Sequence, residues 1–222
     1  MYRLKSALQQ HGLKFVILFV GVFLPLCLFS ALAEDVVEQK IFFFDRPLLS
    51  FIHAHANASL DATMIFFTTA GSALVLVPFN ATVLFYLLWR RQRAQATFWF
   101  LTFAGAALLN YLAKHVFARI RPDLWISIRP ESTFSFPSGH AMQSMAVVAG
   151  LVALAWPGRW RAPALVVGAC FVFLVGLSRV YLGVHFPSDI LAGWTASVAW
   201  VVGLRNLHAW RALPASEKVG TA

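Results

Sequence analysis

The sequence has few charged residues and almost no cysteine. Only 12% of its 222 residues are Asp, Glu, Lys or Arg, and 59% are hydrophobic, whereas about a quarter of an average soluble domain is charged. This shortage of charge excludes an ordinary soluble protein and indicates a chain embedded in a membrane. Cys27 and Cys170 stand in separate apolar runs, where a thiol behaves as a small hydrophobe, so they indicate nothing about the redox compartment.

Long apolar runs take the place of the missing charge. A transmembrane helix needs about 20 mostly apolar residues. Clear candidates lie near residues 15–33, 73–89, 94–113, 141–156 and 162–177, and a weaker one, containing Gly193, Thr195 and Ser197, lies near 190–204. The alternating segments of a membrane β-barrel are not seen. The sequence therefore predicts an all-α integral membrane bundle of about six transmembrane helices.

The predicted organisation has three parts: an N-terminal span with an extracytoplasmic loop (1–60), a core (61–210) and a cytoplasmic tail (211–222). The first span permits two interpretations. Arg3, Lys5 and Lys14 flank it and the letters ALAED follow it, as in a signal peptide with an A-x-A cleavage site. Its apolar run of about 19 residues exceeds a typical signal core, so we favour a retained span.

Positive charge lies at the ends of the apolar runs. The net charge of +9 could suggest nucleic acid, but no basic tract is present, and we expect no nucleic-acid partner. With a cytoplasmic N-terminus, six spans place most cations inside, as the positive-inside rule requires. The exception is one segment predicted outside, which carries Lys114, Arg119, Arg121 and Arg129. These four charges need a local explanation.

Lys114 and Arg121 are seven residues apart, so on a helix leaving the third span they would project from one face. Pro122 would then end the helix or turn the chain. Arg119 and Arg129 do not share this phase, and we expect them to face solvent or lipid headgroups. The alternative role of Lys114 is that of an interfacial anchor.

A second polar cluster, SRVYLGVHFPSD, joins the fifth and sixth runs. A charge such as Arg179 at membrane depth costs roughly 2.5 to 3.5 kcal/mol on insertion scales, so it should have a partner or ligand. His185 and Asp189 are four residues apart, within one helical turn. The carboxylate can orient one imidazole nitrogen and leave the other free as a nucleophile. A purely structural hydrogen bond is the alternative.

The letters PSGH precede the fourth run. Ser138 is a good N-cap, and the free N–H groups that begin a helix, here around Gly139, form an anion site. His140 in the first turn could give a proton to whatever carries the anion, although a capped helix start alone is the alternative. The three clusters fall on one side of the membrane and together supply the groups that phosphoryl transfer needs, without a metal.

These motifs, K-x6-R-P, P-S-G-H and S-R-x5-H-x3-D, resemble the signature of the type 2 phosphatidic acid phosphatases (PAP2), which is shared with vanadium haloperoxidases and bacterial acid phosphatases. The resemblance implies a PAP2/haloperoxidase-like helical core and a lipid phosphatase without a cofactor. It implies that His185 attacks phosphorus to give a phosphohistidine, that Asp189 orients it, and that His140 is the acid and then the base. The phosphoryl oxygens would bind to Lys114, Arg121, Ser138, Gly139 and Arg179.

Similar bacterial enzymes act on undecaprenyl diphosphate, phosphatidylglycerophosphate, phosphatidate or lipid A phosphates, and no sequence feature separates these substrates. The expected location is the inner (plasma) membrane with the site facing the periplasm or exterior. Five aromatic residues suit a membrane interface at the site: Trp125, Phe134, Phe136, Tyr181 and Phe186. The alternatives are a haloperoxidase, which needs no membrane spans, and a non-enzymatic protein that binds or transports lipid phosphates.

Residues 36–61 also permit two interpretations. They form either an amphipathic interfacial segment over the site or a plain loop. Neither interpretation is favoured for the segment as a whole, but we expect His53 and His55 to lie in solvent.

Overall fold

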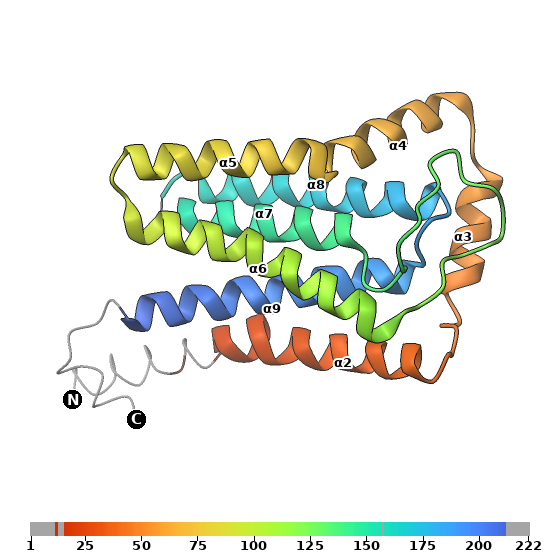
Figure 1. Ribbon diagram of the computed structural model, residues 1–222, viewed down its shortest axis with the longest axis horizontal. Helices are drawn as coiled ribbons and strands as arrows, with labels where there is room; N and C mark the ends of the chain where they lie inside the picture. The colour runs from red at the N-terminus through yellow and green to blue at the C-terminus, as the bar shows by residue number, and fades with distance from the viewer. Residues whose placement is uncertain (1–11, 13–15, 157, 212–222) are drawn as a thin grey trace.

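The computed structural model describes residues 12, 16–156 and 158–211. This part contains helices joined by turns and loops, without a strand. The helices are η1 (Phe19–Phe23), α2 (Leu24–Val37), α3 (Asp45–Ala54), α4 (Ala58–Ala70), α5 (Ala73–Trp89), α6 (Arg93–Phe117), α7 (Gly139–Ala155), α8 (Arg161–Tyr181) and α9 (Pro187–Arg211). Most of them run side by side in an elongated bundle (Figure 1). The all-α membrane fold is therefore confirmed.

The predicted spans all correspond to helices, but not all have the expected length. Four helices of the described part are long and apolar enough to cross a membrane: Val16–Val37, Arg93–Phe117, Arg161–Tyr181 and Pro187–Leu207. Helices α4 and α5 meet at a bend of 41° and together pass the same test, so this span extends beyond the run predicted at 73–89. Helix α7 is shorter, with 17 residues.

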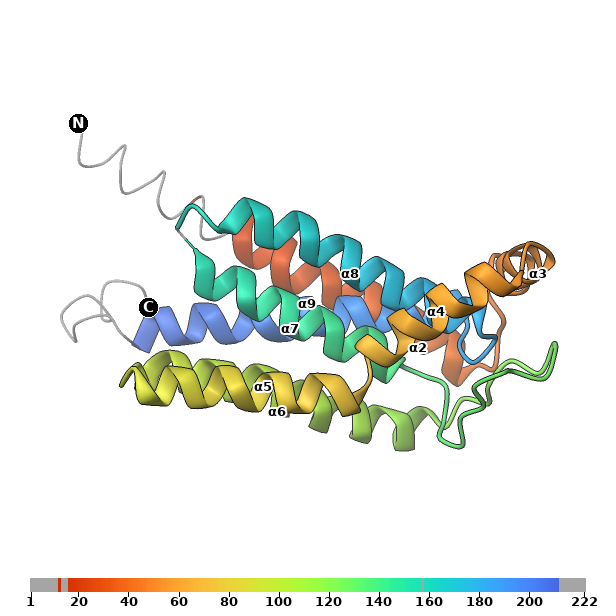
Figure 2. The ribbon, with the colours of Figure 1, turned by 90° about the horizontal axis from the view of Figure 1, so that it is seen from above.

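Helix α7 lies in the interior of the bundle, between α6 and α8 and against α9 (Figures 1 and 2). Gly193 lets the backbone of α9 approach the backbone at the start of α7 closely. A Cβ atom there would lie 2.9 Å from the Ser138 carbonyl oxygen and 3.2 Å from the Met142 nitrogen. Ser197, one helical turn later, donates to the Met142 carbonyl at 2.7 Å. Gly193 and Ser197, which make this run less apolar than the others, thus hold the beginning of α7 in place.

Residues 45–54 form a helix, so the loop interpretation of this segment was wrong. Helix α3 lies across one end of the bundle (Figure 1), with Asp45 and Leu49 buried. His53 is exposed, and its ring stacks on Trp125 with centroids 4.0 Å apart. An amphipathic helix lying across the bundle end fits the interfacial interpretation.

The three polar clusters lie at the same end of the bundle as α3, whereas the α5–α6 and α7–α8 connections lie at the opposite end (Figure 1). The sequence therefore placed the three clusters correctly on a common side. The tail beyond residue 211 and the N-terminal cations Arg3, Lys5 and Lys14 lie outside the described residues.

Candidate active site

His185 lies just before α9, and Asp189 lies in the first turn of that helix. The Nδ1 atom of His185 is 3.4 Å from Asp189 Oδ2. On the other edge of the ring, Nε2 is 3.2 Å from Nη1 of Arg121. Both His185 and Asp189 are buried, at 1% and 0% exposure. One ring nitrogen therefore faces a carboxylate, and the other faces a cation that was expected to bind phosphate.

Lys114 and Arg121 converge as expected, but not by lying on one helix face. Helix α6 ends before Arg121, because Ala118 adopts the left-handed conformation, with φ of 43°. Lys114 Nζ donates to the Phe134 carbonyl. Arg121 donates to the same carbonyl at 3.3 Å and to the Thr133 carbonyl at 2.6 Å. A shared loop, rather than helical phase, brings the two cations together.

Arg179 is the third cation and is 2% exposed. Its Nη2 lies 2.5 Å from Glu131 Oε1, and its Nη1 donates to the Thr68 hydroxyl. Its buried Nε has no hydrogen-bond partner among the described residues. A buried donor without an acceptor is costly, so the Nε donor of Arg179 is available for a further hydrogen bond. The expectation that this charge has a partner is confirmed in Glu131, to which the sequence analysis gave no role.

The PSGH segment begins α7 as predicted, with Ser138 as the N-cap. The Ser138 hydroxyl oxygen accepts from the Ala141 N–H at 3.5 Å, and the Ser138 N–H donates to the Asp189 carbonyl at 3.1 Å. Among the described residues, the N–H groups of Gly139 and His140 have no acceptor. Such free N–H groups make a helix start attractive to anions.

The site combines a neutral imidazole with a positive surrounding. Burial, followed by the charges of Arg121 and Arg179, lowers the pKa of His185 well below its ordinary value of 6.5, so this ring is uncharged at neutral pH. Burial also lowers the pKa of Arg121. Burial alone would raise the pKa of Glu131, but the ion pair with Arg179 outweighs it and the net shift is downward.

Arg119 does not face solvent, so that prediction was wrong. Its side chain is 9% exposed, with Nη1 2.6 Å from Asp189 Oδ1 and Nη2 3.0 Å from Asp45 Oδ2. The helical phase on which the prediction rested does not apply, because α6 ends at Phe117 and Arg119 lies in the loop that follows. Arg129 is exposed, as expected.

Ser135 is a further residue of the site that sequence reasoning missed. Its hydroxyl donates to Asp189 Oδ2 at 2.5 Å and lies 3.3 Å from His185 Nδ1. The Phe186 N–H donates to the same carboxylate oxygen at 2.9 Å. No spacing in a single sequence distinguishes Ser135 from the other serines nearby.

The five aromatic residues assigned to the membrane interface divide between core and surface. Phe136, Tyr181 and Phe186 are buried and belong to the core. Phe134 is exposed and Trp125 is partly buried.

Comparison with known proteins identifies the family. The sequence model of the PAP2 superfamily matches residues 95–213, which contain all three motifs. The chain belongs to the PAP2 superfamily. An undecaprenyl-diphosphatase from Sulfolobus acidocaldarius is 32% identical over 171 residues, covering 74% of this chain and 77% of that protein.

Two further matches come from Bacillus subtilis. Its phosphatidylglycerophosphatase B is 31% identical over 141 residues, covering 61% of this PAP2 protein and 69% of the relative. The crystal structure of a transmembrane PAP2 type phosphatidylglycerolphosphate phosphatase matches with a TM-score of 0.74 at 25% identity, covering 86% of this chain and 98% of that one. This PAP2 protein is accordingly a multi-pass membrane hydrolase of the lipid phosphatase type.

Proposed function

We propose that the protein removes a phosphate or diphosphate headgroup from a membrane lipid through a phosphohistidine at His185. The Nε2 lone pair attacks phosphorus, and the bond from phosphorus to the leaving oxygen breaks as His140 gives that oxygen a proton. Water, deprotonated by His140, then attacks the phosphohistidine. The phosphorus–nitrogen bond breaks, the phosphate product leaves, and His185 is again neutral.

The observation that carries this proposal is the orientation of the His185 ring. Asp189 faces Nδ1, where it can stabilise the positive charge of a phosphorylated ring, and Nε2 faces the cations. Arg121 lies within hydrogen-bond distance of Nε2. A phosphoryl group would draw this guanidinium onto its oxygens and leave Nε2 free to attack.

The remaining donors support binding of the phosphoryl oxygens. Lys114 and Arg179 supply charge, and the start of α7 supplies the Gly139 N–H. The Ser138 N–H is already bonded to the Asp189 carbonyl, so Ser138 would contribute through its hydroxyl. Protein cations alone can neutralise the phosphoryl group in this arrangement, and we therefore propose a metal-independent reaction.

An apolar groove supports a lipid substrate. It lies between α2, α6 and α9, has a volume of about 460 Å³, and is lined by residues that include Leu26, Leu112 and Trp200. The groove also touches Pro137, the residue before Ser138. A hydrocarbon tail in this groove would bring its headgroup to the start of α7. The names of the relatives support two substrate classes, polyprenyl diphosphates and glycerophospholipid phosphates.

We further propose that the site faces the periplasm or exterior of the inner (plasma) membrane. The cation-rich turns, with Arg90, Arg91 and Arg159, lie at the end of the bundle opposite the site (Figure 1). Cytoplasmic loops are enriched in Lys and Arg, so these turns support a cytoplasmic position for that end.

The test is phosphate release by the purified full chain from undecaprenyl diphosphate, phosphatidylglycerophosphate, phosphatidate and a lipid A phosphate. We expect release from at least one of them, a histidine-linked phosphate that is acid-labile and base-stable, and only background activity in His185→Ala. The mechanism is refuted if His185→Ala retains turnover, or if the phosphate is trapped on another residue.

A further inference from the structure

Arg119 joins two buried carboxylates that are far apart in the sequence. One arm of its guanidinium donates to Asp189 Oδ1 at 2.6 Å, and the other donates to Asp45 Oδ2 at 3.0 Å. Ser188 closes the network: its N–H and hydroxyl donate to Asp45 at 2.9 and 2.6 Å, and its hydroxyl oxygen accepts from Arg119 at 2.8 Å. Asp45, Asp189 and Ser188 are all 0% exposed. This network reaches the carboxylate that faces His185.

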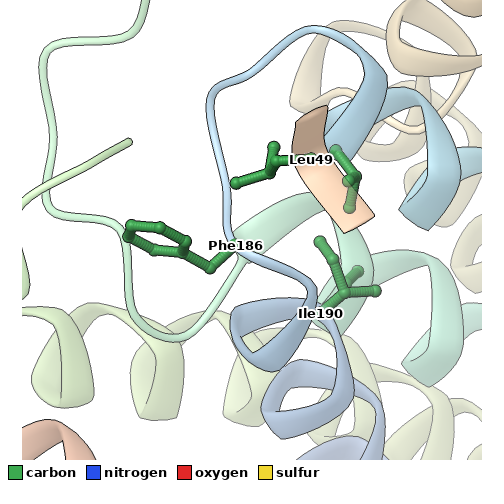
Figure 3. Close-up of a cluster of buried hydrophobic side chains, with 5 residues drawn as sticks. Leu49, Phe186 and Ile190 are labelled. Carbon is green, nitrogen blue, oxygen red and sulfur yellow. The ribbon is translucent and has the colours of Figure 1, made fainter. Parts of the chain in front are cut away.

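An apolar contact reinforces the network. Leu49 lies one helical turn after Asp45 on α3 and packs in a buried cluster with Phe186 and Ile190 (Figure 3). These two residues directly follow His185 and Asp189 in the chain. The Arg119 guanidinium also lies over the Phe186 ring, 4.3 Å from its centroid. Helix α3 is thus attached, by polar and apolar contacts, to the segment that carries the nucleophile.

The two carboxylate oxygens of Asp189 have different hydrogen-bond partners. Oδ1 is held by Arg119, while Oδ2 serves Ser135, the Phe186 N–H and His185 Nδ1. A guanidinium is a rigid planar fork, so fixing its second arm on Asp45 fixes the direction of the first. Loss of either contact would release Oδ1 and loosen the orientation of the Asp189 carboxylate toward His185, because only the bonds to Oδ2 would remain. Burial raises the pKa of Asp45, against the hydrogen bonds from Ser188 and Arg119.

We infer that Arg119 and Asp45 are positioning residues that act through Asp189 on the His185 nucleophile, which makes helix α3 part of the catalytic apparatus. Asp45 lies outside residues 95–213, the part matched by the family. This inference rests on the proposed role of His185 as the nucleophile.

The test compares Arg119→Ala and Asp45→Asn in the full chain, with Arg129→Ala, an exposed arginine of the same loop, as the control. We expect kcat for phosphate release to fall by about 10- to 100-fold in Arg119→Ala, the range typical of residues that orient a functional ligand. The inhibition constant for inorganic phosphate should stay within about twofold, because the phosphate-binding cations are untouched. Asp45→Asn keeps the shape of the side chain and should lower kcat in the same way. It provides the test if Arg119→Ala does not fold.

A double-mutant cycle tests whether the effect passes through Asp189. In an Asp189→Asn background, Arg119→Ala should cause little further loss of kcat, because residues in one network are non-additive. The inference is overturned if both single variants keep wild-type kcat, if inhibition by inorganic phosphate weakens in step with kcat, or if the two losses simply multiply.

A second measurement needs no turnover. ¹⁵N spectra of labelled histidine, assigned by comparison with His185→Ala, should show the His185 proton on Nδ1 in the wild type and a mixture of tautomers in Arg119→Ala. If the wild type releases no phosphate from any lipid, the proposed function fails and the spectra alone decide the inference. Unchanged His185 signals in Arg119→Ala and Asp45→Asn would overturn it.

Discussion

Replacing His140 with alanine should slow the enzyme by a factor that depends on the leaving group. His140 lies in the first turn of α7, and its removal leaves Lys114, Arg121 and Arg179 in place, so the phosphoryl group should still bind. General acid catalysis typically contributes about 100- to 10,000-fold, which corresponds to about 2.7 to 5.4 kcal/mol of barrier. A lipid alkoxide needs the proton and should show this full loss.

An aryl phosphate with an acidic phenol leaves without a proton, so its loss in His140→Ala should be below about tenfold, or about 1.4 kcal/mol. The assay is the rate of the first phosphoenzyme burst with each substrate, because His140 is also the proposed base for the second step. Slow hydrolysis would therefore accumulate the phosphohistidine without affecting the burst. Equal losses for both leaving groups, with the leaving-group dependence appearing in Lys114→Ala instead, would refute the assignment of His140 as the acid.

Four further predictions concern topology, metals, pH and packing. With both native cysteines replaced, Asp123→Cys should react with an impermeant thiol reagent in cells whose inner membrane is intact; labelling only after rupture would place the site in the cytoplasm. Activity should survive EDTA and be inhibited by vanadate, whereas loss that Mg²⁺ restores would indicate a metal mechanism. The pKa of His185 is lowered on folding, so below about pH 6.5 the unfolded chain binds a proton that the folded protein does not, and stability should decrease as the pH is lowered. A thermal midpoint with the same pH dependence in His185→Ala would contradict this. Gly193→Ala should lower both the thermal midpoint and activity, because its Cβ would meet the Ser138 carbonyl at 2.9 Å, whereas Gly203→Ala, with nothing within 4 Å, should change neither; equal effects would argue against the packing explanation.

Some contacts of the site could be predicted from the sequence, and others could not. The ring of His185 faces Asp189 as their spacing of four residues indicated, and Ser138 caps α7 as its residue type indicated. These are contacts between residues three or four positions apart in the chain. Lys114 and Arg121 do converge, but the helical geometry used to predict it was wrong, because α6 ends at Phe117.

The sequence alone determined the membrane class, the helical runs and the three motifs. Each depends on composition or on neighbours a few residues apart, where the backbone geometry is fixed by the local hydrogen bonds of a helix. The network of Arg119 with Asp45 and Asp189 was decided only by the tertiary structure. Arg119 and Asp45 are 74 residues apart, and their contact depends on where the loop after α6 turns and on how α3 lies across the bundle end. Burial then makes the pairing necessary, because an ionised side chain removed from water needs a partner of opposite charge.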